Sequence, residues 1–496
     1  MSAPLADDNR HVLPRWRDLR NTLASGELRP ALSTDPVRSP ARDELSERIS
    51  DWRQEPSVGV AADAIGAAIV LGRSAEALEP AQFIVDHEGD AAPASVELAR
   101  RIISGPTVTA TTKVTEAAIR ETLRGLKHGV RVDPRNAFGW AELARNYALV
   151  GQLERSLSAM GIALALAPNH RYIVRSAARL YTHIGEPDRA HTIISRAEST
   201  FDDPWLLAAE LATAELAGKR PGLIRRARAL SESGNIHPFD KTELASELAT
   251  IEAQAGGLRR ARKLFRVALE KPNDNAVAQA RWAATHKIFE LDPNILYLER
   301  AYEARAWYTF YSGQWDLSLA AGKRWLSDQP FSASPAVHSS YVASLAIEDY
   351  ASAIRLSRRG LRANPGNANL LNNLAYSLAC AGSTSEASAI LAKIHQDNLP
   401  NAQRSVIGAT AGLIHFRSGD PAQGRQLYEL ALRWASEHGD RRLAAKVALF
   451  LAYEEIRANT PVAAAASASG LMLSSEFKNA DFDMLRERLQ RAKRAR

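Results

Sequence analysis

The chain has 496 residues, of which 46% are apolar and 24% charged, a composition typical of a folded protein and not of a disordered one. Its net charge of +7 is a small excess of 63 basic over 56 acidic residues, which does not indicate nucleic-acid binding by itself and favours acidic over basic partners. The single cysteine, Cys380, excludes an intramolecular disulfide and fits a cytoplasmic protein.

Residues 1–56 are rich in proline and lack regular apolar spacing except in DELSERISDW at 43–52. They predict an extended lead segment with one or two short helices. The start of the chain has no continuous apolar core of a secretory signal. The most apolar window, VGVAADAIGAAIVLG at 58–72, is interrupted by Asp63 and is too short to span a bilayer. We therefore expect a soluble protein with no membrane partner.

Residues 57–130 have the length of helical pairs but only a weak apolar spacing, and we expect degenerate helical repeats there. Within them, SGPTVTATTK at 104–113 lacks the glycine spacing and the Gly-Lys-Ser/Thr ending of a phosphate-binding loop. A nucleotide site is therefore not predicted.

Residues 131–204 repeat one spacing of small and large residues. Numbered backwards from Pro168 as position 32, the first copy has large side chains at positions 4, 11 and 24 and small ones at 8, 20 and 27: Trp140, Tyr147, Met160, Ala144, Ser156 and Ala163. One period later the same positions hold Val174, Tyr181, Ile194, Ala178, Ala190 and Ala197. Small residues let two helices approach closely and large ones fill the gaps beside them, so this spacing predicts paired helices.

The pattern resembles the tetratricopeptide repeat (TPR), a helix-turn-helix unit with a period of about 34 residues. The resemblance implies an all-α protein, a right-handed α-solenoid of stacked helix-turn-helix (TPR-like) repeats in which each pair buries the apolar face of its neighbour. Prolines near position 32, as in LAPNH, EKPND and ANPGN, predict where one helix stops and the next starts. No window shows the alternation of a strand.

The remaining boundaries follow from how well this spacing persists. Residues 131–204 are expected to be TPR repeats, and residues 205–298 degenerate TPR-like repeats. Residues 299–432 are again expected to be TPR repeats, with Pro330 and Pro365 as anchors. Residues 433–496 are expected to form a C-terminal helical cap with the basic tail LRERLQRAKRAR. That tail is either a solvated helix end or a docking arm, and the sequence leaves both open.

Signatures of catalysis are missing from the sequence. It has no P-loop, HExxH, GxSxG, Rossmann or CxxC motif, and its histidines are scattered without ligand spacing. We expect no enzymatic activity, no cofactor and no metal.

The TPR resemblance places partner binding on the concave surface, lined by the first helix of each unit, where positions 2, 5, 6, 9, 12 and 13 point away from the core. In two adjacent units these positions hold a cationic strip suited to carboxylates or phosphates: Arg145, Arg175, Arg179 and His183. The alternative is that each arginine pairs with a nearby acidic side chain such as Glu142. Both interpretations stay open at the level of sequence.

Two further sets of residues occupy the same positions. One is an aromatic cluster, expected to be exposed as an anchor for a partner's side chain: Trp307, Phe310 and Tyr311. A different register would instead bury Trp307 and Tyr311. The other set resembles the amide ladder with which some TPR proteins hold an extended peptide: Asn369, Asn372 and Asn373.

The sequence thus predicts a cytoplasmic, non-enzymatic adaptor or scaffold for protein–protein interaction. Its partner would be an extended or helical segment with acidic and aromatic features, bound in the concave groove. The alternative is a regulatory or sensor subunit of a multi-component, nucleic-acid-linked system of bacterial type, in which the basic tail and arginines meet phosphates and binding falls steeply with salt. Nucleic acid is the less favoured partner, and the oligomeric state stays open.

Overall fold

The computed structural model describes residues 11–19, 21–22, 27–28, 41–70, 74–91, 93–104, 116–395, 397 and 399–495. The expected lead segment at 1–56 and the loop at 104–113 lie partly outside these residues. All regular elements in the described part of the chain are helices, which confirms the all-α class. The described chain divides into two compact units, which we describe separately: an N-terminal unit with the described residues of 11–147 and 153–295, and a C-terminal unit with residues 148–152 and the described residues of 296–495.

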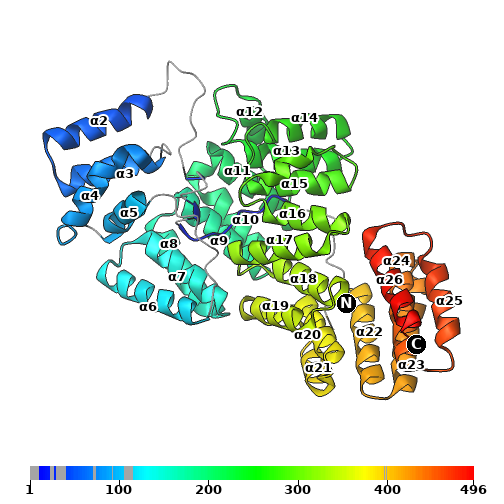
Figure 1. Cartoon of the computed structure of the whole chain (residues 1–496). Coiled ribbons are helices and arrows are strands. Elements are labelled where there is room, and N and C mark those ends of the chain that lie inside the picture. The colour runs from blue at the N-terminus through cyan, green and yellow to red at the C-terminus, as the bar shows by residue number, and fades with distance from the viewer. Residues whose placement is uncertain are drawn as a thin grey trace. The chain divides into compact units, whose positions relative to one another are not determined.

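The N-terminal unit is a succession of short helices (blue to green in Figure 1). In chain order they are α2 (Ala41–Gln54), α3 (Val58–Val70), η1 (Ser74–Ala77), α4 (Leu78–Asp86), α5 (Pro93–Ser104), α6 (Glu116–Val132), α7 (Ala137–Leu149), α8 (Leu153–Leu166), α9 (Arg171–His183), α10 (Pro187–Arg196), η2 (Glu198–Phe201), α11 (Pro204–Leu216), α12 (Ile224–Glu232), α13 (Thr242–Gln254), α14 (Leu258–Ala268) and α15 (Asp274–Thr285).

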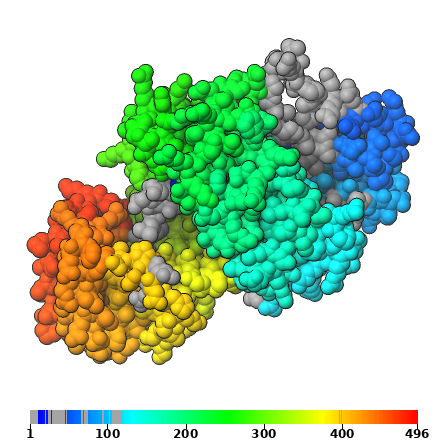
Figure 2. Space-filling model, turned by 180° about the vertical axis from the view of Figure 1, so that it is seen from behind, coloured from blue at the N-terminus to red at the C-terminus, as the bar shows by residue number. Residues whose placement is uncertain are grey.

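The C-terminal unit continues the same plan (light green to red in Figure 1). Its elements are η3 (Pro293–Tyr297), α16 (Tyr302–Tyr311), α17 (Trp315–Asp328), α18 (Ala333–Tyr341), the π-helical turn η4 (Val342–Ala346), α19 (Tyr350–Ala363), α20 (Ala368–Cys380), α21 (Thr384–Leu391), α22 (Asn401–Arg417), α23 (Pro421–Glu437), α24 (Arg441–Arg457), α25 (Ala463–Ser474) and α26 (Ala480–Arg494). In the space-filling view, the yellow, orange and red parts of this unit lie next to one another on the face shown (Figure 2).

Within each unit the helices stack in pairs. Many first helices contact the second helix of their own pair, as α9 contacts α10 and α22 contacts α23, and several also contact the first helix of the following pair. The contacts α9–α11, α11–α13 and α13–α15 form a continuous layer of first helices in the N-terminal unit, and α18–α20, α20–α22 and α22–α24 form one in the C-terminal unit. This is the stacking that the repeat spacing predicts, because each pair covers the apolar face of the next.

Prolines and short polar residues set the helix boundaries. Pro168 lies two residues after the end of α8, and Pro365 two residues after the end of α19. Side-chain oxygens of Asp203, Asn273 and Asn367 accept hydrogen bonds from backbone N–H groups in the first turns of α11, α15 and α20. These caps satisfy donors that have no partner within the helix, so the polar turns of the repeat fix where each first helix begins.

Small residues at positions 8 and 20 mark the closest approach of the two helices in a pair. At position 20, the Ser156 hydroxyl donates to the carbonyl of Ala144 at position 8, at 2.7 Å. The equivalent Ser318 hydroxyl donates to the carbonyl of Ala306 at 2.9 Å. A buried hydroxyl at this point satisfies its own hydrogen bond and fixes the register of the pair, which a bulkier side chain would not allow.

The turn between the helices of a pair has a positive φ at position 15. Glycine, which adopts this conformation without strain, occupies it in most units: Gly151, Gly185, Gly313, Gly382 and Gly419. In the unit anchored on Pro365 the residue is Glu348, with φ 60°. This exception lies beside the C-terminal helix α26.

No helix among the described residues is both long enough and apolar enough to cross a membrane.

Candidate functional site

The layer of first helices in the N-terminal unit holds a segment of the chain's own N-terminus. We call the described residues between 11 and 28 the N-terminal segment; its residues 11–18 carry no helix. It runs among the helices of this unit (dark blue in Figure 1) and contacts side chains of α7, α9, α13 and α15. Val12, Trp16 and Arg17 are each 1% exposed, so the segment is enclosed and not draped over the surface.

Side chains of four helices hydrogen-bond the backbone of this segment. Glu247 on α13 accepts from the Val12 N–H at 2.7 Å, and Glu142 on α7 accepts from the Leu19 N–H at 2.9 Å. Asn275 on α15 donates to the Leu13 carbonyl at 2.9 Å, and Arg171 on α9 donates to the Glu27 carbonyl at 2.8 Å. We call these four residues, together with Arg145, Tyr172, Arg175, Glu243 and Asp274, the first-helix face. Because these contacts grip backbone groups, they recognise an extended chain irrespective of much of its sequence.

Three ion pairs add side-chain recognition to the backbone contacts. Arg17 donates to Asp274 at 2.6 Å, with the two side chains 1% and 8% exposed. Asp18 lies 3.5 Å from the Arg145 guanidinium. Glu27 lies 3.8 Å from the Arg175 guanidinium. The segment therefore presents a cation, an anion and a second anion to groups of opposite charge on the face.

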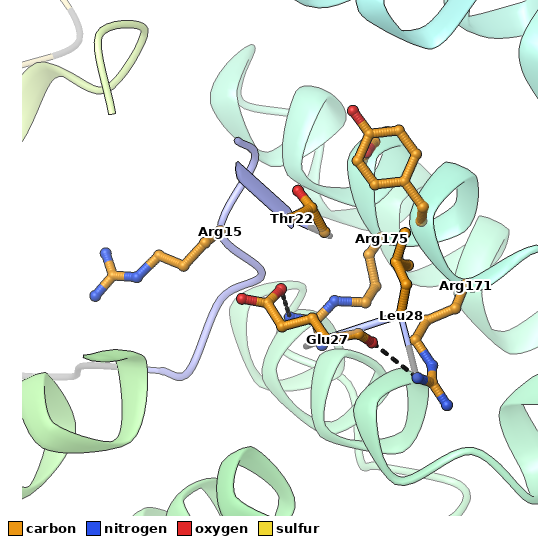
Figure 3. Close-up of a pocket in the computed structure, with 8 residues that line it drawn as sticks. Arg15, Thr22, Glu27, Leu28, Arg171 and Arg175 are labelled. Carbon is orange, nitrogen blue, oxygen red and sulfur yellow. Dashed lines mark hydrogen bonds and ion pairs between the residues drawn. The ribbon is translucent and has the colours of Figure 1, made fainter. Parts of the chain in front are cut away.

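Arg175 is the most heavily engaged cation of the face. Its guanidinium donates to Glu243 at 2.9 Å and to the Trp205 carbonyl at 2.9 Å, and it lies 5.2 Å from the centroid of the Trp205 ring. Figure 3 shows the Glu27 carboxylate directed at Arg175, while the Glu27 carbonyl meets Arg171. Burial alone lowers the pKa of Arg175, but Glu243 and Glu27 outweigh it and raise the pKa above its ordinary value, so the cation is retained.

Glu27 and Glu142 are carboxylates in an apolar setting. Burial raises the pKa of Glu27 above its ordinary value, although Arg175 and Arg17 act in the opposite direction. Burial likewise raises the pKa of Glu142, against the nearby Arg145 cation and a hydrogen bond from the Tyr172 hydroxyl. Each carboxylate is thus stabilised by a specific partner, and losing that partner would leave a costly buried charge.

The predicted cationic strip is only partly available to a partner from outside. Arg145 is 8% exposed and lies 4.0 Å from Glu142 as well as close to Asp18, and Arg175 is 5% exposed within the network described above. Pairing with nearby carboxylates, the alternative that the sequence left open, is what the structure shows for these two arginines. Arg179 and His183 follow Arg175 along α9 and are half-buried. Partner binding by the strip stays a prediction.

The aromatic cluster of the C-terminal unit lies mostly in the core, and the expectation that it is exposed was wrong for two of its members. Trp307 is 7% and Phe310 5% exposed, whereas Tyr311 is 38% exposed. The Trp307 ring packs edge-on against His338 of α18, with centroids 4.8 Å apart, and against Phe310 at 5.7 Å. Helix α18 therefore covers the side of α16 that faces away from α17.

The asparagines of α20 are also not arranged as an exposed ladder. Asn372 and Asn373 are both fully buried. The Asn373 amide donates to the Ser340 hydroxyl at 3.1 Å, which links α20 to α18, and Asn372 makes no hydrogen bond within the described structure. The half-buried Asn369 accepts from Gln403 of α22 at 2.8 Å. These amides join neighbouring first helices, and an exposed backbone-binding row is not formed.

Helix α26 carries a buried cation, Arg488, that connects it to neighbouring helices of its unit. Arg488 is 3% exposed, donates to the Tyr376 and Tyr350 hydroxyls at 3.0 Å each, and lies 4.3 Å from the centroid of the Tyr453 ring. Burial lowers the pKa of Arg488, but the surrounding tyrosines raise it well above its ordinary value. Part of the basic tail thus anchors α26 to its own unit.

Three carboxylates of the first-helix face were missed from sequence, and only Glu142 was named there. Glu243 and Glu247 occupy one side of α13, and Asp274 and Asn275 begin α15, in units whose repeat spacing is degraded. A count of acidic as well as basic side chains on each first helix would have found them. The described residues contain no group of His, Cys, Asp and Glu side chains that could hold a metal ion.

Glu210 on α11 gives the N-terminal unit a pH-dependent stability. Burial raises the pKa of its carboxyl to about 7, while a backbone hydrogen bond from Gly222 acts in the opposite direction; His191 lies 4.0 Å away. Because the pKa of Glu210 is higher in the folded state than the ordinary value of 4.5, the protonated carboxyl favours the folded state. This stabilisation is complete below pH 4.5 and is lost as the pH rises through 7. At pH 8 we expect the free energy of unfolding of E210Q, measured by urea titration, to exceed that of the wild type by on the order of 2 kcal/mol. This difference in free energy should shrink as the pH falls toward 5. Parallel urea profiles of the two proteins from pH 5 to 8 would contradict this.

Comparison with known proteins gives little beyond these observations. No family model matches the sequence, and no curated protein matches it. Among solved structures, a monomeric mutant of IFIT1 with Gppp-AAAA is 14% identical, with a TM-score of 0.34 over 96% of this chain and 100% of that one. The human IFIT1 dimer with PPP-AAAA is 14% identical, with a TM-score of 0.33 over 96% and 99%. At these values the likeness carries no argument about what this chain binds.

Proposed function

We propose that this chain is a non-enzymatic adaptor that binds an extended segment of a partner protein on the first-helix face of its N-terminal unit. The observation that carries the proposal is the set of four backbone hydrogen bonds that Glu142, Arg171, Glu247 and Asn275 make to the N-terminal segment, which has no helix at 11–18, a helical turn at 19 and 21–22 and a turn at 27–28. Side chains of four first helices, α7, α9, α13 and α15, that meet the backbone of one segment form a surface for peptide recognition. Arg145, Arg175 and Asp274 would add specificity for charged side chains.

The chemistry of the N-terminal segment supports the expected partner class. The segment combines a buried aromatic side chain, Trp16, with two acidic side chains, Asp18 and Glu27, that meet arginines of the face. It also carries Arg17, whose partner Asp274 lies on the same face. We therefore propose a partner segment with aromatic, acidic and basic residues, in a cytoplasmic setting.

The alternative, a subunit that meets nucleic acid, is less well supported. Phosphate binding needs accessible cations, and Arg145 and Arg175 are buried next to carboxylates that would repel a phosphate. Arg491 near the end of α26 has a 62% exposed side chain and pairs with Glu348. A single exposed pair of this kind does not make a phosphate-binding surface.

A photo-crosslinking amino acid placed at Arg179 tests the proposal. Arg179 lies one turn after Arg175 on α9, so a partner on the face should crosslink to this position in the native cells. The matched control carries the same amino acid at Lys263, an exposed position on the second helix α14. We expect a protein product at 179 that resists nuclease and is missing at 263. Nuclease-sensitive products would favour a subunit that meets nucleic acid. Identical products at both positions would contradict partner binding on the first-helix face.

A further inference from the structure

The N-terminal segment is bound in the manner of a ligand. Its contacts join residues far apart in the chain, 235 positions between Val12 and Glu247 and 257 between Arg17 and Asp274. They include hydrogen bonds and ion pairs from side chains of several helices to a segment that has no helix at 11–18. Val12, Pro14 and Trp16 are buried as well, so the segment adds apolar contacts to the polar ones.

The helix pairs beneath the segment have hydrophobic clusters of their own. The cluster of α9 and α10 is built on Val174, Tyr181 and Ile194, and that of α11 to α13 on Leu207, Leu230 and Leu248. The cluster of α13 to α15 is built on Phe265 and Trp282. These three clusters contain only residues from the repeats, and the buried Val12 and Trp16 of the segment are not among them.

Charge complementarity defines what else could occupy the face. Without the segment, Asp274 would lack the Arg17 guanidinium and Glu247 the Val12 N–H donor, while Arg175 would lose one carboxylate. Buried charges of this kind favour an occupant that restores each pair. The occupant must bring an extended backbone, an arginine for Asp274, a carboxylate for Arg175 and an apolar or aromatic side chain in place of Trp16.

We propose that the N-terminal segment is an exchangeable internal ligand that holds the first-helix face in cis, and that a partner binds by displacing it with a segment of the same chemistry. This inference rests on the proposed function for the existence of a partner. It adds that the face is self-occupied and that the partner's recognition sequence resembles HVLPRWRD followed by an acidic residue. Access to the face is then controlled by release of the chain's own N-terminus.

The expected strength of this control follows from tethering. A segment joined to its site by a short linker competes at an effective concentration on the order of 1 mM. A free peptide with a Kd of about 10 µM for the empty face would therefore bind the intact chain about 100-fold more weakly. A partner must therefore bind the face tightly enough to compete with the tethered segment, or the segment must dissociate from the face before the partner binds.

Cutting the tether tests the proposal without requiring the chain to fold in its absence. A protease site is inserted between Thr34 and Asp35, the full-length protein is purified, and binding of a fluorescent peptide of residues 11–28 is followed by anisotropy before and after cleavage. We expect weak binding before cleavage and at least a 100-fold gain after it. Circular dichroism should show unchanged helix content in the cut protein.

A double-mutant cycle checks that the exchanged peptide uses the contacts seen in cis. The R17A peptide should bind the cut protein at least 10-fold more weakly than the unchanged peptide. In a cut D274A protein the same peptide change should have little further effect, because Arg17 and Asp274 act through one interaction. Equal binding of both peptides to the cut wild type would contradict the assigned contacts.

Three outcomes would overturn the proposal. The cut protein could keep its N-terminal fragment through gel filtration in a large excess of unlabelled peptide, or it could lose helix content with the fragment; either result would make the segment a permanent part of the fold. The uncut protein could bind the peptide as tightly as the cut one, which would mean that the face is not occupied in cis. This assay uses only the chain itself, so peptide exchange without a crosslinked partner at 179 would refute the adaptor function and leave the internal ligand standing.

Discussion

Replacing Gly424 with alanine is expected to destabilise the C-terminal unit by about 3 kcal/mol. Gly424 on α23 and Gly412 on α22 occupy positions 20 and 8 of their pair, where the helices touch. A Cβ atom at 424 would lie 2.5 Å from the Phe416 ring and 2.8 Å from the Gly412 carbonyl oxygen. The backbone carbonyl cannot move without shifting α22, so the pair must separate and lose packing.

Gly408 provides the matched control for this substitution. It also lies within α22, but a Cβ atom there would meet nothing within 4 Å. We expect G408A to be neutral or to stabilise the helix by up to about 1 kcal/mol, because alanine is the better helix former. Urea unfolding followed by circular dichroism distinguishes the two variants, and equal stabilities would show that α22 and α23 are not in close contact.

The second large effect is expected for R488A, which should cost about 3 kcal/mol and loosen α26. The substitution leaves the Tyr376 and Tyr350 hydroxyls without their buried donor and removes the cation from the Tyr453 ring. Hydrogen exchange measured by mass spectrometry should show α26 opening about 100-fold more often, since each 1.4 kcal/mol is a factor of ten.

Arg491 is the control within the same helix. Both arginines pair with the Glu348 carboxylate: the Arg491 guanidinium lies 2.7 Å from it and the Arg488 guanidinium 3.7 Å. The Arg491 side chain is 62% exposed, whereas that of Arg488 is 3% exposed. Solvent screens an exposed ion pair, so R491A should change stability by less than about 0.5 kcal/mol. Equal exchange rates in the two variants would mean that the tyrosine contacts of Arg488 contribute nothing to holding α26.

The helix pairs could be predicted from sequence because their contacts are local and periodic. Ser156 and Ala144 are twelve residues apart, and so are Ser318 and Ala306, and in both pairs the repeat position alone identifies the contact. Small residues at the crossing points are required wherever two helices approach closely. The repeat spacing therefore predicts the helix pairs without information about contacts between residues farther apart in the chain.

The candidate site could not be predicted in the same way. Repeat positions indicate which side of a helix turns away from its own pair, but not what then covers that side. Trp307 was expected to be exposed on this basis and is covered by His338 from the next first helix. Arg175 was expected to face away from the core of its pair, and its partner Glu27 comes from a lead segment with no repeat spacing. Contacts over such separations leave no periodic signal in one sequence.

The glutamate at position 15 has a consequence for the order in which the C-terminal unit forms during synthesis. Glu348 adopts a left-handed backbone, φ 60°, that costs a residue with a side chain about 1 kcal/mol or more, whereas most other turns of this kind use glycine. Its carboxylate reaches Arg491, which leaves the ribosome 143 residues later. Until then the strained turn has the Tyr350 hydroxyl at 3.5 Å but lacks its contacts with Arg488 and Arg491, so this part of the unit acquires its full set of contacts only when α26 emerges and docks.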